Sequence, residues 1–329
     1  MSAPNESVKT SVSANTSRTR RSRRTRADKT TCRIGFVGAG RLASAIITGL
    51  IVHPRDNPNE RPVEPKRIYV TAPTTVNTDQ LKITFPGIRV SKRNIDIFGR
   101  FDCDIVFICV PPSVIKNLYK IGGTRPAALT TNYIPNMRHP VYVFSLVFGY
   151  KCDQIKECLL NPENPDRYAV KFFRCVLSHS IAYGVGNCWV NAEPDSKNFP
   201  ELVRDILSRI CRIEYLPETH MDSVCTITGA GLAFCYYFIN AIADGAVKLG
   251  FPRASAIKLA SKIASSTSQT ILHTGDNASK LKEDASSPSG GAIFGQMVLD
   301  KGEVASGICA GIEEAYKRSY TMANSGEAH

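Results

Sequence analysis

The first two thirds of the chain alternate short apolar runs with segments whose apolar positions recur at helical spacing. The first run is Arg33–Val37, and residues 44–50 follow it with the pattern of a helix. Further apolar runs predict strands at residues 67–71, 88–90, 104–110, 141–145 and 212–216. Strands that alternate with helical segments are typical of an α/β domain with a doubly wound parallel sheet.

The pattern changes to long helices after residue 216. The segment Leu232–Ala243 is apolar nearly all round, and a helix of this kind has to be buried on every side. In a small helical domain that burial requires a second subunit, so we expect an obligate homodimer. Asp244-Gly245 and Leu249–Arg253 interrupt the apolar run, and Ser255 is expected to start another helix that continues to about Thr274. The chain is therefore divided into a sheet domain at 31–216 and a helical domain at 217–325.

A glycine-rich turn lies between the first strand and the first helix. Its sequence is Gly38-Ala-Gly-Arg-Leu-Ala43. In this context Gly38 makes a tight turn, Gly40 lets the backbone approach a pyrophosphate, and Ala43 lets the helix pack close to the strand. Strand, glycine turn and helix together are the fingerprint of a Rossmann-type dinucleotide-binding domain, with the phosphates at the helix N-terminus.

The end of the second strand bears on the choice of dinucleotide. An acidic residue there would bind the ribose 2′-hydroxyl of NAD, but the first acid after residue 71 is Asp79. NADP(H) is therefore favoured and NAD(H) stays possible. Thr71, Thr74 and Arg41 are the candidate partners of a 2′-phosphate, although each of them could equally be an ordinary turn residue.

Pro111 and Pro112 end the apolar run Asp104–Val110, which has the pattern of a buried parallel strand. Ser113 is expected to cap the helix that follows. Ligands of doubly wound sheets bind outside the carboxyl ends of the strands, which places Val110, Pro111 and Pro112 beside the expected cofactor.

The net charge of +12 is divided unevenly along the chain. Residues 1–30 contain eight basic and two acidic residues and hold half of that charge. They contain almost no apolar residues, so we expect a disordered tail. A mitochondrial presequence, a nucleic-acid contact and an inert extension are the alternatives, and the lack of an amphipathic apolar face favours the last.

Cysteine and histidine spacing argues against a disulfide framework and against a metal site. The eleven cysteines are an odd number without a CxxC pair, and the six histidines show no metal-binding spacing. No metal ligand is assigned. No run is expected to be long and apolar enough to span a bilayer. We expect a soluble protein in the cytoplasm, with mitochondria as the alternative.

Three segments together resemble the pyrroline-5-carboxylate reductase family. They are Ile34–Ala43, Ile242–Arg253 with its ADGxVKxGxPR pattern, and Leu281–Gly290 with LKxxxxSP. The second and third are far more specific than the glycine turn, and the resemblance covers nearly the whole chain after residue 30.

The resemblance implies a reductase that transfers hydride from NAD(P)H to the C=N carbon of a cyclic imine. The expected substrate is 1-pyrroline-5-carboxylate, the product is L-proline, and the role is proline biosynthesis. No catalytic residue is assigned, since the protein mainly orients two rings. The resemblance also implies a homodimer with exchanged helical domains, possibly in a larger ring. It places the substrate carboxylate at Ser287, Ser289, Gly290 and Gly291, with Ala292 also in the substrate site. It adds Asn94 to the expected cofactor-binding residues, which are then Gly38, Gly40, Arg41, Leu42, Thr71, Asn94, Val110, Pro111 and Pro112.

The chain departs from the family pattern at several positions in the expected site. SPGGxT reads Ser287–Ala292 when aligned without gaps, which replaces a threonine by Ala292. VKP reads Val110–Pro112, GSGPA reads Gly229–Ala233, and TNTP reads Leu177–Ser180. Each lost hydrogen-bond donor costs about 1 to 3 kcal/mol, or one to two decades in rate. A divergent dinucleotide-binding dimer with weak or different reductase activity is therefore the alternative function.

Overall fold

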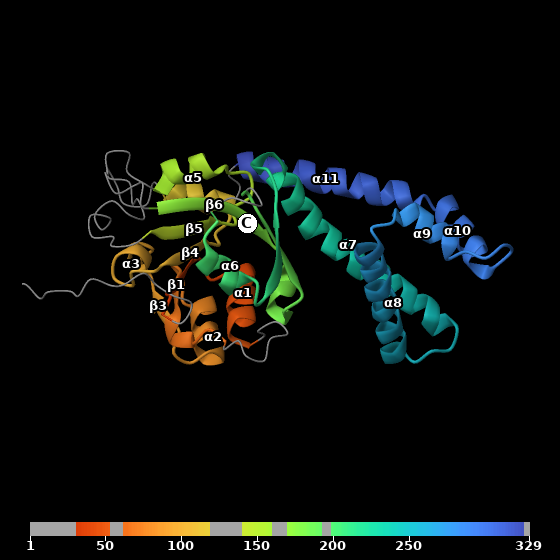
Figure 1. Ribbon diagram of the computed structural model, residues 1–329, viewed down its shortest axis with the longest axis horizontal. Coiled ribbons are helices and arrows are strands. Elements are labelled where there is room, and N and C mark those ends of the chain that lie inside the picture. The colour runs from red at the N-terminus through yellow and green to blue at the C-terminus, as the bar shows by residue number, and fades with distance from the viewer. Residues whose placement is uncertain (1–30, 53–61, 119–139, 160–169, 193–198, 326–329) are drawn as a thin grey trace, which may run out of the picture.

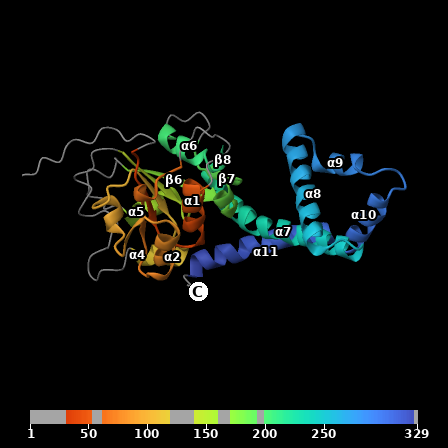
Figure 2. The ribbon, with the colours of Figure 1, turned by 90° about the horizontal axis from the view of Figure 1, so that it is seen from below.

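The computed structural model describes residues 31–52, 62–118, 140–159, 170–192 and 199–325 of the chain. Figure 1 shows two parts: a sheet covered by helices, and an arm of long helices that extends away from it. The view from below in Figure 2 shows the same separation, with α7 and α11 leading from the sheet into the arm. The tail at 1–30, on which three alternatives were weighed, lies outside the described residues.

The first part is built on an eight-stranded sheet with the order β3-β2-β1-β4-β5-β6-β7-β8. All neighbouring strands are parallel except β6 and β7, which are antiparallel. The prediction of an α/β domain with a mostly parallel sheet is confirmed. The strands are β1 (Ile34–Val37), β2 (Ile68–Thr71), β3 (Arg89–Ser91), β4 (Ile105–Ile108), β5 (Val141–Ser145), β6 (Val170–Leu177), β7 (Gly186–Val190) and β8 (Cys211–Tyr215).

Helices cover both faces of this sheet, and successive strand residues feed two separate cores. Ile34 and Phe36 belong to one core with residues of α1 and α6, whereas Val37 belongs to the other with residues of α3 and α5. Burial on both faces explains the continuous apolar runs in the sequence. The helices are α1 (Arg41–Val52), α2 (Val76–Thr84), α3 (Ile95–Phe98), α4 (Pro112–Leu118), α5 (Cys152–Leu159) and α6 (Glu201–Leu207), with the 3₁₀ helices η1 (Pro65–Arg67), η4 (His179–Tyr183) and η5 (Glu218–His220).

A row of aromatic rings crosses the first core. Phe144 stands at its centre, with ring centroids 5.5 Å from Phe107, 5.2 Å from Phe173 and 6.0 Å from Phe199. The Phe144 side chain is fully buried, and its ring connects β5 to β4, β6 and the segment before α6. Ring pairs at these distances add to the stabilisation that burial of their area gives.

Replacing Phe144 by alanine is expected to lower the free energy of unfolding by about 3 to 5 kcal/mol, because it leaves a cavity beside three other rings. Urea denaturation of the two proteins measures the difference. The matched control is Ile83→Ala in α2, where the side chain is 74% exposed and the expected change is within about 0.5 kcal/mol. Equal losses for both variants would contradict this description of the core.

The second part consists of α7 (Met221–Lys248), α8 (Arg253–Thr274), α9 (Ala278–Asp284), α10 (Gly291–Lys301) and α11 (Val304–Ser325). Its own core is small: Ala243, Ala256 and Ala260 are buried between α7 and α8. Most of α7 is exposed within one chain, with Tyr237 at 79%. A helix pair with so little shared core needs further apolar contacts for its stability.

The turn between α7 and α8 is held by a polar cluster that joins Asn240 to the two ends of the ADGxVKxGxPR segment. The Arg253 guanidinium is paired with the Asp244 carboxylate and donates to the Asn240 side-chain oxygen at 2.5 Å. The Asn240 amide in turn donates to Asp244 at 3.0 Å. The most specific segment of the resemblance therefore closes a helical hairpin.

Three expected helix limits were wrong. The helix α7 continues through Asp244-Gly245, because a glycine inside a helix costs only about 1 kcal/mol and does not end it. The helix α8 begins at Arg253, after Pro252, and not at Ser255. The helix α4 begins at Pro112, whose fixed φ suits the first helical position, so Ser113 lies inside the helix and is not its cap.

Among the described residues, one helix is long and apolar enough by composition to cross a membrane. It spans Glu218–Lys248 and has a mean hydropathy of 1.4 in an 18-residue stretch of which 6% is buried within the chain. The expectation that no run reaches this length and apolarity was wrong. The glycines and hydroxyl residues between the apolar residues of this helix interrupt the apolar run, but they leave its mean hydropathy high.

Candidate functional site

The glycine turn at the end of β1 is fixed between the ends of β2 and β4. Gly38 has a φ of +101° and donates its N–H to the Thr71 carbonyl at 2.8 Å. A Cβ at this position would lie 2.6 Å from the Cys109 carbonyl oxygen. Only glycine fits both the backbone conformation and the space.

Gly40, the next glycine of the turn, lies in open space. A Cβ built on it would have no atom within 4 Å from any described residue other than its two chain neighbours. It directly precedes α1, which has no acidic residue in its first turn, so the free N–H groups and the helix dipole favour an anion there. Leu42 is half-buried and Ala43 is buried against the sheet. A tight turn, a free approach and unpaired donors fit the pyrophosphate of a dinucleotide.

Thr71 is not available to a ligand, which corrects one predicted contact. Its side chain is fully buried, and its hydroxyl donates to the Phe36 carbonyl at 3.3 Å. Side chains along a strand point alternately to the two faces of the sheet, and the last residue of β2 follows this rule. The sequence alone did not show toward which face the Thr71 side chain points. Thr74 and Arg41 are exposed, as a 2′-phosphate partner requires.

Two basic residues that the sequence analysis did not single out follow the neighbouring strand. Ser91 ends β3 beside Thr71, and its carbonyl accepts a hydrogen bond from Ala72 at 3.2 Å. Lys92 and Arg93 come next and are exposed, with the Arg93 guanidinium 3.6 Å from the Asp96 carboxylate. A basic pair directly after a strand was the signal that could have indicated them.

The remaining predicted cofactor residues lie at the carboxyl ends of β3 and β4. Asn94 is half-buried immediately before α3, and its side chain makes no capping hydrogen bond. A Val110 methyl group would lie 3.1 Å from a Cβ on Gly38, so Val110 contacts the glycine turn. Pro111 is exposed and Pro112 starts α4. The structure therefore places Val110 against the glycine turn and the other residues after strands of the same sheet.

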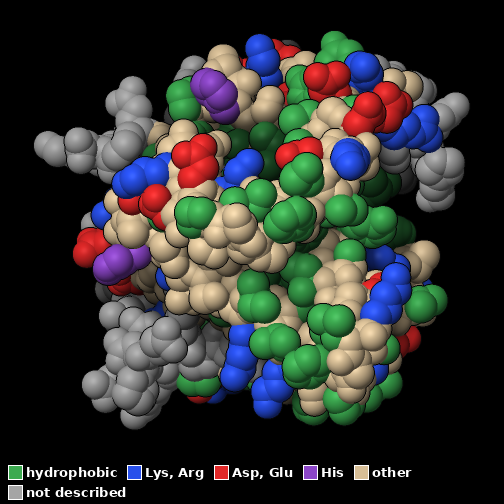
Figure 3. All heavy atoms as spheres, turned by 90° about the vertical axis from the view of Figure 1, so that its right-hand side faces the viewer, with side chains coloured by type: hydrophobic (Ala, Val, Ile, Leu, Met, Phe, Trp, Pro, Cys, Tyr) green, Lys and Arg blue, Asp and Glu red, His purple; other side chains and the backbone are tan. Residues whose placement is uncertain are grey.

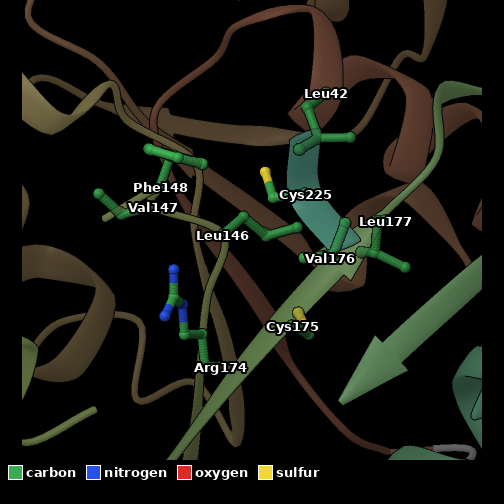
Figure 4. Close-up of a pocket in the computed structure, with 9 residues that line it drawn as sticks. All are labelled: Leu42, Leu146, Val147, Phe148, Arg174, Cys175, Val176, Leu177 and Cys225. Carbon is green, nitrogen blue, oxygen red and sulfur yellow. The ribbon is translucent and has the colours of Figure 1, made fainter. Parts of the chain in front are cut away.

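A pocket opens between α1, the carboxyl ends of β5 and β6, and the start of α7. Its lining is mostly apolar, and Figure 4 shows Arg174 extending along one wall on the side of Val147 and Phe148. Burial raises the pKa of the Cys225 thiol to about 11, so this group stays protonated at neutral pH. The lining residues are Leu42, Leu146, Val147, Phe148, Arg174, Cys175, Val176, Leu177 and Cys225.

The predicted substrate residues form a tight turn before α10. The Gly290 N–H donates to the Ser287 carbonyl at 2.9 Å, and a Cβ on Gly290 would lie 2.3 Å from the Ser287 hydroxyl oxygen. Ser289 has a φ of +58°, a conformation that glycine adopts more readily than serine. Gly291 starts α10, with open space around it, and Ala292 is exposed beside it.

One chain does not bring the glycine turn and this serine loop together. Figures 1 and 2 both place α10 at the far end of the helical arm, whereas α1 lies against the sheet. The space-filling view in Figure 3 shows hydrophobic side chains gathered over the end of the arm. Exposed apolar residues of this part include Phe294, Met297, Val298 and Leu299 on α10.

Two family models match the chain. The description "Pyrroline-5-carboxylate reductase dimerisation" covers residues 218–322, and "NADP oxidoreductase coenzyme F420-dependent" covers residues 33–126. Pyrroline-5-carboxylate reductase 3 of Xenopus laevis is 26% identical over 88% of this chain and 95% of its own length. The chain is therefore similar to pyrroline-5-carboxylate reductases over most of its length. Pyrroline-5-carboxylate reductase of Synechocystis sp. is 28% identical over 88% of this chain and 97% of its own length.

Solved structures of the pyrroline-5-carboxylate reductase family share the fold. The Plasmodium falciparum pyrroline carboxylate reductase, described with NADP bound, aligns with a TM-score of 0.67 at 20% identity, over 90% of this chain and 99% of that chain. The reductase from Coxiella burnetii aligns with a TM-score of 0.62 at 21% identity, over 88% and 97%. The dimerisation match begins before α7 and includes its apolar surface, which supports the expectation of a homodimer through the helical domain.

Proposed function

We propose that this chain reduces 1-pyrroline-5-carboxylate to L-proline with NADPH. The observation that carries the proposal is the glycine turn, where Gly38 is the only residue that fits and Gly40 leaves the approach free. The serine loop before α10 supplies hydroxyl and N–H groups at a helix start, which suits a carboxylate. Reductases of this name align over most of the chain and support the substrate.

The residues of the chain mainly bind and orient. Backbone N–H groups at the start of α1 hold the phosphates, and the apolar pocket beside Leu42 excludes water from the ring end of the dinucleotide. Bound NADPH supplies a hydride. Transfer of this hydride to the C=N carbon of an imine whose nitrogen has taken a proton from water would give the secondary amine. Among the described pocket residues no carboxylate or imidazole is present to act as an acid or base.

The substrate loop of one site comes from the second subunit in this proposal. The glycine turn and the loop Ser287–Ala292 lie in different parts of one chain, while the dimerisation match covers the whole arm that carries the loop. An arm that reaches over a partner brings its loop to the partner's sheet. Each dimer would then hold two sites, and every site would combine residues of both subunits.

The preference for NADPH is assigned to the basic groups at the ends of α1, β2 and β3. Arg41, Lys92 and Arg93 are exposed there, Thr74 offers a hydroxyl, and an acid that would repel a 2′-phosphate is absent between residues 71 and 78. A phosphate dianion gains charge-assisted hydrogen bonds from such groups.

A weak or altered reductase is the second candidate function. Ser289 holds a left-handed backbone where the family usually has glycine, and Ala292 lacks the family's hydroxyl. Both changes fall in the loop that would hold the carboxylate. These two changes favour weaker binding of the usual substrate and leave the dinucleotide site as it is.

Imine-dependent oxidation of each cofactor tests both candidates. We expect purified protein to oxidise NADPH when 1-pyrroline-5-carboxylate is added, with kcat/KM for NADPH above that for NADH. Turnover would be followed at the nicotinamide absorbance, with L-proline measured as the product. No L-proline at high enzyme concentration would contradict the first candidate, and turnover of another cyclic imine alone would favour the second.

Three further predictions concern the setting of the protein in the cell. We place it in the cytoplasm, with mitochondria as the alternative, and expect no membrane or nucleic-acid partner. A ring of dimers is the proposed larger assembly. Light scattering of the purified chain would measure its mass, and microscopy of the tagged chain with and without residues 1–30 would locate it.

A further inference from the structure

A partly buried ion pair joins β6 of the sheet to the first turn of α7. The Arg174 guanidinium donates to the Asp222 carboxylate, and the Arg174 side chain is only 3% exposed. A cation so far withdrawn from water is stable only when it is paired and hydrogen-bonded. Arg174 also lines the pocket beside Leu42, so one member of the pair stands in the wall of that pocket.

The same carboxylate holds a third element. Asp222 accepts a hydrogen bond from the Gly149 N–H at 3.0 Å. Gly149 directly follows Leu146–Phe148, the loop after β5 that forms another wall of the pocket. One side chain therefore ties the strand, the loop and the helix that surround the pocket.

Further hydrogen bonds hold the residues on either side of the Arg174–Asp222 ion pair. Glu218, just before α7, accepts from the Cys152 N–H at 2.7 Å. Asn191 accepts from the Arg174 N–H at 2.5 Å and donates to the Cys152 sulfur at 3.3 Å. The start of α7 is thus held to the sheet by two acidic side chains, each of which accepts from a different part of the sheet domain.

We propose that Arg174 and Asp222 are positioning residues, which set the distance between α7 and the carboxyl edge of the sheet. That distance determines the width of the pocket that takes the nicotinamide end of the dinucleotide. The inference rests on the proposed function in that the pocket is assigned to this cofactor. Neither residue is assigned a contact with the reacting atoms, since their charges are satisfied by each other and by the backbone.

Binding of NADPH and of 2′,5′-ADP to variants of the full chain tests this role. The variant Arg174→Met keeps an unbranched side chain and removes the charge. We expect its affinity for NADPH to fall about tenfold or more, while 2′,5′-ADP, which occupies only the adenosine half of the site, binds within about twofold of the wild type. The glycine turn that holds the phosphates is not part of the pair, which is why the two ligands should respond differently.

Two further variants separate positioning from simple stability. Arg174→Lys is expected to recover part of the NADPH affinity, since it restores a cation. The double variant Arg174→Met with Asp222→Asn removes both charges and should recover the Tm lost by the single variant, but not the affinity for NADPH. A structural role alone predicts that affinity and Tm recover together, and that result would overturn the proposal.

Other outcomes are equally decisive. Unchanged NADPH affinity in Arg174→Met, or a parallel loss of both ligands, would contradict a positioning role. The same holds if the wild type binds NADPH no more tightly than 2′,5′-ADP. A wild type that binds NADPH but yields no L-proline would instead contradict the proposed reaction, and the binding test of the pair would stand.

Discussion

Replacing Gly40 by valine is expected to abolish dinucleotide binding and leave the fold intact. Apart from its two neighbours, no described residue has an atom within 4 Å of a Cβ at this position, so the added side chain breaks no described contact. It would instead occupy the space through which a pyrophosphate approaches the backbone at the start of α1. Affinity for NADPH, measured by titration calorimetry, should fall about a hundredfold or more, and Gly40→Ala should give a smaller loss.

Thermal unfolding is the control for this variant. The Tm of Gly40→Val should stay within about 2 °C of the wild type, since no contact of the chain is broken. Gly38→Ala is the variant that should disturb the fold, because its Cβ would lie 2.6 Å from the Cys109 carbonyl oxygen and the φ at this position is +101°. That variant should lower the Tm clearly. Normal NADPH affinity in Gly40→Val would contradict the assignment of the phosphate site.

Restoring a hydroxyl at Ala292 is expected to raise kcat/KM for 1-pyrroline-5-carboxylate by roughly ten- to a hundredfold. A donor that contacts a buried polar group contributes about 1 to 3 kcal/mol, which corresponds to that range. Ala292 is exposed in the first turn of α10, beside the serine loop, so threonine fits without a clash inside the chain. Steady-state kinetics with the imine varied at saturating NADPH measures the gain.

Valine at the same position has the shape of threonine without the hydroxyl and is the matched control. Ala292→Val should give no gain, and equal gains for both variants would show that the effect comes from shape. Adding Ser289→Gly should raise kcat/KM further, because glycine holds a φ of +58° with about 1 kcal/mol less strain than serine. If kcat/KM rises neither in Ala292→Thr nor after the addition of Ser289→Gly, the loop does not limit the activity. Other departures from the family pattern, such as Pro111, would then have to explain it.

The sequence predicted the part of the fold in which local pattern and tertiary structure agree. Six predicted apolar runs became β1, β2, β3, β4, β5 and β8, and Val141–Ser145 was predicted to the residue. The strands β6 and β7 were not predicted, since Gly186–Val190 contains glycine and asparagine and pairs antiparallel with its neighbour. The last strand ends at Tyr215 and the first long helix begins at Met221, while the domain limits at 216 and 217 stay predictions.

Side-chain direction is what the sequence left open in the site. The glycine turn was predicted because Gly38 and Gly40 have a fixed meaning between a strand and a helix. Thr71 was wrongly assigned, since the direction of its hydroxyl depends on which core it faces. Arg174 and Asp222 are 48 residues apart and belong to no local motif, so their pairing appears only when β6 and α7 are brought together.

The measurement that tests the shared site most directly combines two inactive variants. Gly40→Val removes the dinucleotide site, and Gly291→Val fills the open space at the substrate loop, where no described residue beyond its own helix turn lies within 4 Å. Co-expressed in equal amounts, about half of the dimers are mixed, and each mixed dimer has one site with both parts intact. We expect roughly a quarter of the wild-type activity from the mixture and almost none from either variant alone. A co-expressed mixture as inactive as its components would contradict a site built from two subunits.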